Sequence, residues 1–513
     1  MKQSHRILIN STWSCLSLLI DMGIRFFLVK YAIGKLGTEA YAVVVLALSF
    51  DGFINLLRVG TAAATTKYVA DSNARTDQTQ TNEYMSTAVA HGLITGLIAL
   101  LICVYIAYSP SSFVKLPVEL HNEFILTMIV IGITSVVKFL FMPFSGFLGA
   151  LQRYDLVNGI RMAFRVGGSL LIFLIFSFFQ LKPWTYIALY IGSIDAANII
   201  HYFMSKKLSP ALRISPRFVK MWALKALLSF AIFTFLGTFF SSSFLEGSKW
   251  IITNTLGPKM LTFYSIVVML NSHIAQLLVE IMRVLIPTVS RHHALNDISR
   301  LKSIVNRGTR AGTMLVMLML AAGIPIIPQL LRLWLGNEFI WLAPHIRVVL
   351  ICSIISLPSI CSGQVLIGLG KIKTTAILQG LTAIVGLGVL FIGLWWLKLG
   401  FVSTTYALCA SMVFKGIIYN IIGCSHIEQN NWEFAIDIVR PFVIGVIPVA
   451  ITYLISLHIQ ISGWFQLIAY ASLSAAFLSA IYFLTLKKED KQLLLEMGQL
   501  AKNRFSSQVA ARS

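Results

Sequence analysis

The sequence predicts an all-α, polytopic membrane protein of about fourteen transmembrane helices, built as two six-helix lobes followed by two additional helices. Three observations predict this fold class. First, 57% of the 513 residues are hydrophobic and only 12% are charged, whereas soluble domains carry about 25% charged residues. Second, apolar runs recur from end to end, each long enough to cross about 30 Å of hydrocarbon. Third, segments of the first half of the chain return in the second half.

Glycine, proline and charged residues separate the apolar runs and so bound the expected spans. In chain order, the spans are 7–33, 40–68, 84–108, 123–150, 155–180, 184–205, 222–254, 260–287, 309–333, 343–369, 373–397, 402–425, 439–458 and 463–486. The first run continues past Asp21 and Arg25 without a small-residue cleavage site, so we expect a span rather than a removed signal peptide. All connecting loops are short, so the working site must lie among the spans.

The loops between spans differ in their content of basic residues. Residues 206–225 contain six Lys or Arg and no acid, and residues 283–310 contain six with one Asp, whereas residues 109–123 contain one Lys and two Glu. The positive-inside rule therefore places both termini in the cytoplasm. The acidic loop 426–437 breaks the pattern, and the orientation follows the majority. The tail 487–505 is either an amphipathic helix on the inner surface or a solvated tail.

Two segments repeat at nearly the same offset. Tyr41 matches Tyr264 at a shift of 223 residues, and Gly149 matches Gly368 at a shift of 219. This indicates a duplicated six-span unit, whose two copies share one orientation because six is even, and places the working site between the halves. The predicted units are residues 1–207 for the N-terminal lobe, 208–437 for the C-terminal lobe, 438–486 for the two additional helices and 487–513 for a cytoplasmic tail.

Ten charged residues lie well inside the expected spans. Six are basic and are candidate substrate-binding residues: Arg25, Arg58, Lys138, Arg165, Lys249 and Lys415. Four are acidic and are candidate ion-coupling residues: Asp21, Asp51, Asp195 and Glu280. Ionisable groups inside a membrane face a bundle interior or a wet cavity. Even four acid–base pairs would leave two cations, and such an excess suits an anion such as phosphate or pyrophosphate.

Two structural alternatives stand beside these assignments. Asp21 and Arg25 are spaced i,i+4 on one helix face and could simply neutralise each other. Four further basic residues lie near span ends, where long side chains reach the interface by snorkelling. These four are Lys30, Arg161, Arg283 and Arg347.

Other functional motifs are absent or weak. The stretch "GLGK" (368–371) lacks the upstream Gly and following Ser or Thr of a phosphate-binding loop, so we expect no ATP hydrolysis. The six cysteines lie in apolar spans without metal-ligand spacing, so we expect no metal site, cofactor or disulfide framework. Single histidines in spans are typical of packed polar residues. The net charge of +21 lies in loops and sets topology, so we expect no nucleic-acid partner.

Four stretches carry a family resemblance: "KLGTEAYAVVVLAL" (35–48), "LLRVGTAAATTKYVA" (56–70), "LGPKMLTFYSIVVML" (256–270) and "VLIPTVSR" (284–291). Through them the whole chain resembles the polysaccharide exporters of the MOP/MATE superfamily, the Wzx-type flippases for lipid-linked oligosaccharides and their lipid II relatives. The resemblance implies a V-shaped, cation-lined cavity between two lobes and alternating access. It also implies cavity arginines in the first two spans, which Arg25 and Arg58 match. Where members often carry an Asp, Ser248 precedes Lys249, so no coupling role is carried over there.

We therefore expect a flippase, not an enzyme. Its substrate would be an undecaprenyl-diphosphate-linked oligosaccharide, an O-antigen or exopolysaccharide repeat unit, moved from the cytoplasmic to the periplasmic leaflet of the bacterial inner membrane. We expect contacts with membrane lipids and a monomeric protein, with a glycan polymerase and a chain-length regulator as candidate partners.

Two alternatives stay open at this point. A cation-coupled multidrug antiporter of the MATE type usually has twelve spans and relies on acidic sites. A membrane-embedded glycan polymerase or acyltransferase needs a large loop or a His/carboxylate site at a membrane face.

Overall fold

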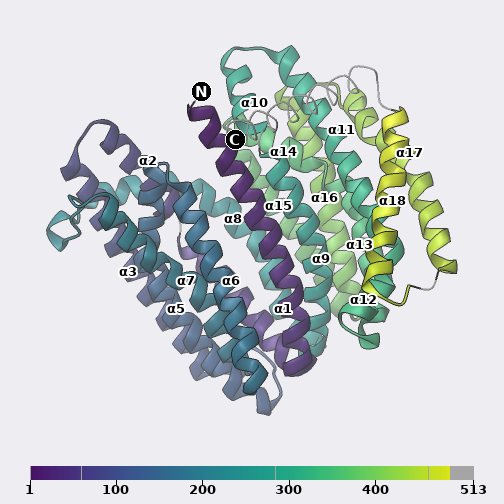
Figure 1. The fold of residues 1–513 in the computed structure, drawn as a ribbon, viewed down its shortest axis with the longest axis horizontal. Helices are drawn as coiled ribbons and strands as arrows, with labels where there is room; N and C mark the ends of the chain where they lie inside the picture. The colour runs from purple at the N-terminus through teal and green to yellow at the C-terminus, as the bar shows by residue number, and fades with distance from the viewer. Residues whose placement is uncertain (1, 59–60, 284, 460, 486–513) are drawn as a thin grey trace, which may run out of the picture.

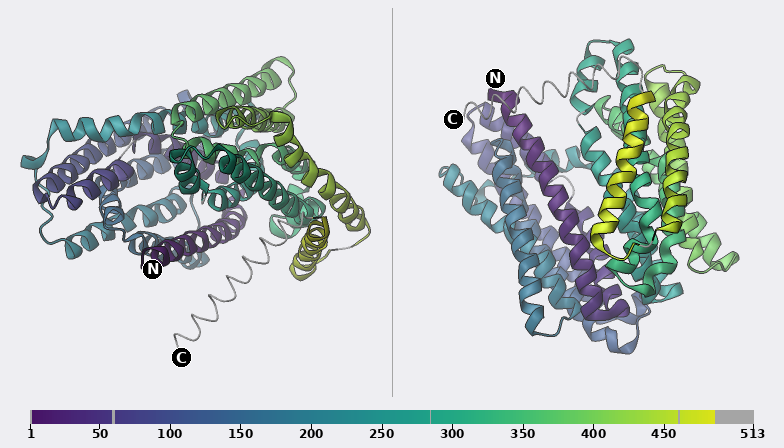
Figure 2. Two further views of the ribbon diagram at one scale, coloured as in Figure 1. Left: turned by 90° about the horizontal axis from the view of Figure 1, so that it is seen from above. Right: turned by 45° about the vertical axis from the view of Figure 1, so that its right-hand side comes forward.

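The computed structural model of the chain describes residues 2–58, 61–283, 285–459 and 461–485, apart from the side chains of 2–17, 58, 61, 230–234, 287, 431, 433 and 437. Within these residues the fold is all-α, without a strand (Figures 1 and 2). The predicted fold class is therefore confirmed. The expected tail segment at 487–505 lies outside the described residues, as does the side chain of Cys15.

The helices follow one another through short connections. In chain order they are α1 (Lys2–Ile54), α2 (Thr61–Ala74), α3 (Gln78–Tyr108), α4 (Pro110–Phe113), α5 (Val118–Ala150), α6 (Tyr154–Phe178), α7 (Pro183–Leu208), α8 (Met221–Leu256), α9 (Pro258–Met282), α10 (Leu285–Ala294), α11 (Ile298–Gly323), α12 (Ile327–Trp334), α13 (Ala343–Ser356), α14 (Ser359–Gly368), α15 (Ile372–Phe391), α16 (Val402–His426), α17 (Asn431–His458) and α18 (Trp464–Thr485). A 3₁₀ turn, η1 (Asn55–Arg58), joins α1 to α2.

Twelve segments of the described chain are long and apolar enough to cross a membrane. The first, Leu18–Ala74, contains two passes, because α1 is interrupted at Gly37, whose φ of 80° and ψ of 168° are not helical. A positive φ of this size favours glycine, which has no Cβ. Counting the first segment twice and adding α8, which has 36 residues and is not among the twelve, gives fourteen, so the number of fourteen passes stays a prediction.

Two of the expected spans are divided by proline. The span 309–333 is α11 followed by α12 with Pro325 between them, and the span 343–369 is α13 followed by α14 with Pro358 between them. Proline has no backbone N–H, so it removes a hydrogen bond of the helix ladder and bends or ends the helix. Each pair of short helices still forms one pass.

The passes gather in two groups with α1 and α8 between them (Figure 1). In the first group α5 packs against α3 and α7, and in the second α15 packs against α8 and α16. The helices α17 and α18 both pack on α11 at the edge of the second group (Figure 2). The lobe boundaries at 207 and 437 stay predictions.

Glycines allow α3 and α5 to approach closely. A Cβ on Gly92 would lie 2.1 Å from the carbonyl oxygen of Phe139, and a Cβ on Gly96 would lie 2.8 Å from Cα of Val136. The two glycines are four residues apart and so face the same neighbour. Small residues at this spacing are typical of close helix pairs in membranes, where van der Waals packing stabilises association.

We expect Gly92→Ala to destabilise the protein, because the added methyl group would force α3 away from α5. Overpacking of this kind costs about 1–3 kcal/mol. The apparent unfolding temperature of the purified protein in detergent measures the effect. Gly388→Ala on α15 is the matched control, since a Cβ there meets nothing within 4 Å. Equal unfolding temperatures for the two variants would contradict the close packing of α3 on α5.

Candidate functional site

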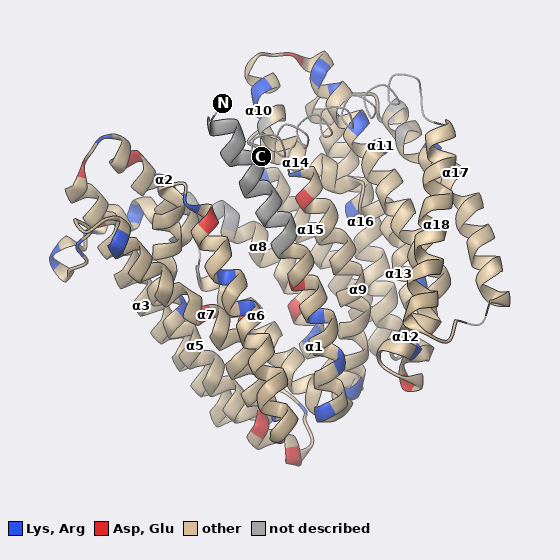
Figure 3. Cartoon of the chain, in the orientation of Figure 1, with Lys and Arg blue, Asp and Glu red and all other residues tan. Residues whose placement is uncertain are grey.

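A cavity of about 1010 Å³ lies between helices of the first and second halves of the chain. Its walls come from α1, α2, α5, α6 and α7 on one side and from α8 and α9 on the other. Figure 3 shows charged residues midway along α1, α6 and α7, well away from the helix ends. The charged residues that line the cavity are Arg25, Lys138, Arg161, Arg165, Lys249, Asp51, Asp195 and Glu246.

One carboxylate joins two arginines on different helices. Asp21 lies 2.8 Å from Nε of Arg25, one turn further along α1, and 3.0 Å from Nε of Arg165 on α6. Arg165 also donates a hydrogen bond of 2.8 Å from Nη1 to the hydroxyl of Tyr190, and its guanidinium lies 5.1 Å from the centre of the Tyr190 ring. The i,i+4 pairing of Asp21 with Arg25 is therefore present, but it is part of a cluster with two guanidiniums and one carboxylate. We name these three residues the arginine cluster.

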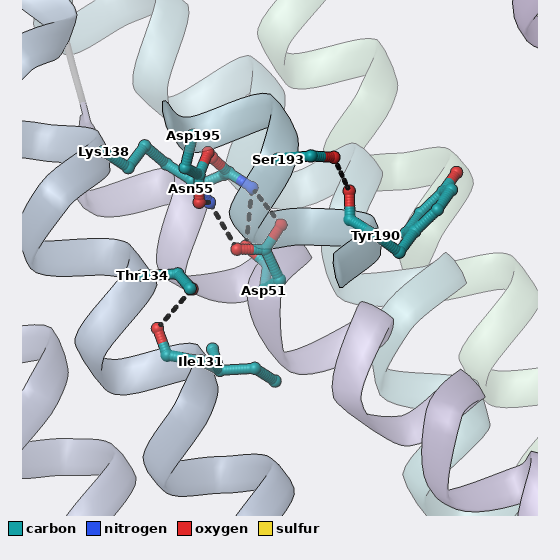
Figure 4. Close-up of polar contacts among 8 residues, drawn as sticks. All are labelled: Asp51, Asn55, Ile131, Thr134, Lys138, Tyr190, Ser193 and Asp195. Atoms are coloured by element: carbon teal, nitrogen blue, oxygen red, sulfur yellow. Dashed lines mark hydrogen bonds and ion pairs between the residues drawn. The ribbon is translucent and has the colours of Figure 1, made fainter. Parts of the chain in front are cut away.

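A second cluster has the opposite balance of charge (Figure 4). Nζ of Lys138 on α5 lies 2.5 Å from Asp51 on α1 and 3.7 Å from Asp195 on α7. The amide of Asn55 donates to the second oxygen of Asp51 over 2.9 Å. Lys138 is 6% exposed and Asp195 is 4% exposed, so these charges depend on one another rather than on solvent. We name Asp51, Lys138 and Asp195 the lysine cluster.

The basic residue on α8 has its own partner. Nζ of Lys249 lies 2.6 Å from Glu246, one turn earlier on the same helix. Ser49 on α1 donates a 3.1 Å hydrogen bond to the backbone carbonyl of Glu246, which joins the two helices. Ser248, which stands where family members often carry an Asp, is buried and shares a 2.8 Å hydrogen bond with the hydroxyl of Tyr264.

Sequence reasoning missed two charged residues of the cavity. Arg161 was expected to snorkel at a span end, but it lines the cavity. The signal was available, because Arg161 and Arg165 are spaced i,i+4 and share a face of α6. Glu246 was not singled out, although it lies i−3 from Lys249 within the expected span.

Three predicted site residues are not placed in the cavity. Glu280 pairs with Arg283 over 3.1 Å near the end of α9, and neither residue lines the cavity. Lys415 on α16 lies 5.9 Å from the centre of the Tyr419 ring and is likewise not among the cavity residues. Arg58 is the last residue of η1, and its side chain lies outside the described residues.

Within the described part of the chain, no group of three or more His, Cys, Asp or Glu residues could hold a metal ion. His273 lines the cavity singly. The cavity thus offers ionic and hydrogen-bonding groups, with five basic and three acidic side chains among its described lining residues. Adding Asp21 of the arginine cluster still leaves an excess of one positive charge.

Comparisons with known proteins are consistent with this architecture. Residues 7–293, more than half of the chain, match the family model described as "Polysaccharide biosynthesis protein". The membrane protein EpsK of Bacillus subtilis (strain 168), itself uncharacterized, is 20% identical over 496 residues, which are 95% of this chain and 97% of EpsK.

Solved structures of the same fold are transporters and flippases rather than enzymes. The inward-facing conformation of a multidrug resistance MATE family transporter of the MOP superfamily superposes with a TM-score of 0.67 at 14% identity, over 81% of this chain and 94% of that one. The lipid II flippase MurJ in an inward closed conformation gives a TM-score of 0.66 at 12% identity, over 93% of this chain and 99% of that one.

An outward-facing MATE structure fits less well. Its TM-score is 0.56 at 14% identity, over 82% of this chain and 95% of that one. At such identities the likeness concerns the fold alone, and the fold is nearer to the inward conformations. The chain is a member of the polysaccharide biosynthesis protein family, with the fold of the MOP superfamily transporters.

Proposed function

We propose that this protein is a flippase that moves an undecaprenyl-diphosphate-linked oligosaccharide from the cytoplasmic to the periplasmic leaflet by alternating access. The arginine cluster carries the proposal, because Arg25 and Arg165 share the single carboxylate of Asp21 beside the cavity. A diphosphate cannot enter hydrocarbon without compensating groups. Guanidinium groups bind phosphate oxygens in a bidentate manner and stay charged inside proteins.

In the substrate-free protein Asp21 supplies the anion that both guanidiniums need. A diphosphate carries more charge and more acceptor oxygens than one carboxylate, so it would compete with Asp21 for Arg25 and Arg165. The excess of positive charge among the cavity residues supports an anionic substrate. An excess of negative charge in the cavity would instead indicate an antiporter for cationic drugs.

Contacts at one end of the cavity support loading from the other end. Beyond Gly37, Thr262 on α9 donates a 2.6 Å hydrogen bond to the carbonyl of Thr38. Between the arginine cluster and Gly37, the rings of Phe26 and Trp334 stack with centres 4.2 Å apart, and Trp334 donates to the carbonyl of Phe26 over 2.9 Å. These contacts hold the two helix groups together on the Gly37 side of the arginine cluster. The substrate would therefore enter from the end at which α1 begins.

We propose that this open end faces the cytoplasm. The helix α18 ends at the same end of the molecule as α1 begins, as an even number of passes requires (Figure 1). The connection between α10 and α11, within the basic segment 283–310, lies there too (Figure 1). Basic loops remain on the cytoplasmic side of bacterial membranes.

A topology experiment tests this orientation. Reporters fused after Lys207 and after Ser513 should be cytoplasmic, and reporters fused after Ser111 and after Lys182 should be periplasmic, because the basic loops stay inside. Paired reporters, one active in each compartment, measure the location at each site. A periplasmic reporter after Ser513 together with a cytoplasmic one after Lys207 would contradict fourteen passes.

Substitution of Arg25 tests the binding role of the arginine cluster. Arg25→Ala should abolish glycan export at normal abundance, since Asp21 keeps Arg165 as its partner. Arg25→Lys should retain part of the activity, because it keeps the charge and loses the planar fork. Export is measured as surface glycan, and abundance by quantitative immunoblotting of membranes.

The matched control is Arg153→Ala, which removes an arginine that is paired with Asp155 over 2.9 Å on the surface, outside the cavity. Its export should equal that of the wild type. If Arg25 served only as the structural partner of Asp21, the result would differ. The double change Asp21→Asn with Arg25→Gln would then restore export at normal expression. That restoration would contradict direct contact with the diphosphate.

We further propose that a carboxylate of the two clusters couples flipping to a proton or sodium gradient. The lysine cluster holds two carboxylates beside one ammonium, and the charge of Arg161 also acts on Asp195, so protonation or ion binding at either carboxylate would change this balance of charge. Placing carboxylates inside a membrane costs free energy, and ionisable side chains found there are typically part of functional sites. Glu280 pairs with Arg283 and is not among the residues that line the cavity, so this proposal rests on the carboxylates of the two clusters.

Neutral substitutions test this coupling. At least one of Asp21→Asn, Asp51→Asn and Asp195→Asn should make transport in vesicles independent of the imposed ion gradient, because the coupling ion loses its carboxylate. Glu280→Gln is the control and should respond to the gradient as the wild type does. If all three cluster variants transported normally and followed the gradient, coupling through these carboxylates would be excluded.

A further inference from the structure

A second, apolar cavity of about 310 Å³ lies between α1 and α6. Its lining residues are Gly23, Ile24, Phe27 and Leu28 from α1 and Val166, Ser169, Leu170 and Phe173 from α6. Ser169 offers it no free polar group, because its hydroxyl donates to the carbonyl of Arg165 over 2.7 Å. We call this cavity the α1–α6 groove.

The groove continues directly from the arginine cluster. Gly23 and Ile24 lie between Asp21 and Arg25 in the chain, and Val166 follows Arg165. All the charged members of the cluster therefore lie within about one helical turn, or about 5.4 Å along the axis, of residues that line the groove. The same pair of helices presents guanidinium groups on one side and an apolar trough beside them.

The outer rim and one end of the groove are defined by aromatic and aliphatic side chains. Phe27 is 63% exposed and Leu170 is 56% exposed, so both face the surrounding hydrocarbon. Towards Gly37 the groove ends where the rings of Tyr31 and Phe173 meet with centres 4.5 Å apart. A Cβ on Gly23 would meet nothing within 4 Å, so this glycine leaves the trough open.

The depth of the arginine cluster identifies the kind of lipid that could use both features. Arg165 lies eleven residues into α6, and Arg25 lies twelve residues before Gly37, which places them about 16 Å and 18 Å from the ends of their passes. The headgroup of a resident phospholipid lies at the membrane surface, not near the middle of about 30 Å of hydrocarbon. A lipid phosphate at this depth would be that of a lipid being moved across.

We propose that the α1–α6 groove binds the first isoprenoid units of the lipid carrier while Arg25 and Arg165 bind its diphosphate. This proposal rests on the proposed function and adds the place of the lipid chain. The isoprenoid chain would pass from hydrocarbon into an apolar groove, so binding removes no apolar surface from water. The groove would therefore stabilise the bound lipid through packing and would orient it. It holds the head at the cluster while the tail stays in the membrane.

Filling the groove tests the proposal. In full-length protein reconstituted in lipid nanodiscs, Gly23→Trp should weaken the binding of undecaprenyl diphosphate by about tenfold, equivalent to about 1.4 kcal/mol. Binding of inorganic pyrophosphate, which has no tail, should equal that of the wild type. The matched control is Gly167→Trp on α6, where a Cβ also meets nothing within 4 Å and which does not line the groove. Both ligands should bind this control as they bind the wild type.

A second measurement does not depend on the folding of the tryptophan variant. A photoreactive benzoylphenylalanine replacing Phe27, on the exposed rim, should be crosslinked to the isoprenoid chain of bound undecaprenyl diphosphate, and excess pyrophosphate should reduce the yield. Crosslinking to phospholipid alone would overturn the proposal.

The remaining outcomes separate the groove from the function. If Gly23→Trp binds undecaprenyl diphosphate as tightly as the wild type, the groove assignment is wrong and the flippase proposal stands. If Gly23→Trp loses pyrophosphate binding as well, the substitution acts on the arginine cluster and the groove assignment is again wrong. If the wild type binds neither ligand, the recognition of a diphosphate fails, and the proposed function fails with it.

Discussion

An ionised side chain inside hydrocarbon must have a counter-charge or water beside it, and the packing of the helices around the cavity depends on this constraint. Asp21 joins α1 to α6 through Arg165, and Lys138 joins α1 to α5 and α7 through Asp51 and Asp195. Both clusters take a carboxylate from α1, one from each side of the interruption at Gly37. Removing one partner of a buried pair costs about 3–5 kcal/mol, because the other charge is left without compensation. The charge balance in the first half of the chain therefore depends on α1, the helix that passes the cavity twice.

The two clusters have complementary imbalances. The arginine cluster has two cations and one carboxylate, which suits a further anion, whereas the lysine cluster has one ammonium and two carboxylates, of which Asp195 is also influenced by the charge of Arg161. Because α1 belongs to both, a movement of α1 that admits a diphosphate would also change the distances around Lys138. Coupling between two sites requires an element with two arrangements that both ligands bias. The interrupted helix α1 is such a candidate element, and it is also the helix that lines the apolar groove.

The fold by itself does not decide what is carried. Structures of a multidrug transporter and of a lipid II flippase superpose on this chain about equally well, with TM-scores of 0.67 and 0.66. Function must therefore be argued from the site, not from the architecture. Here the site combines guanidinium groups well inside α1 and α6 with an apolar trough between the same two helices. An amphiphile with an anionic head matches this combination better than a compact cation does.

The all-α class and the recurrence of membrane-crossing helices could be predicted from the amino-acid sequence alone, because hydrocarbon leaves the backbone no partners other than its own and the length of an apolar run then specifies a helix. It also indicated Arg25, Arg165 and Lys138 as cavity residues, since charges inside a membrane are too costly to face lipid. Only the tertiary structure decided which charges meet. The 143 residues between Asp21 and Arg165 carry no periodicity that relates one residue to the other, and the face that a helix turns to the cavity is set by the neighbours on which it packs. For that reason Arg161 and Glu246 joined the cavity, and Glu280 and Lys415, equally deep in the sequence pattern, did not.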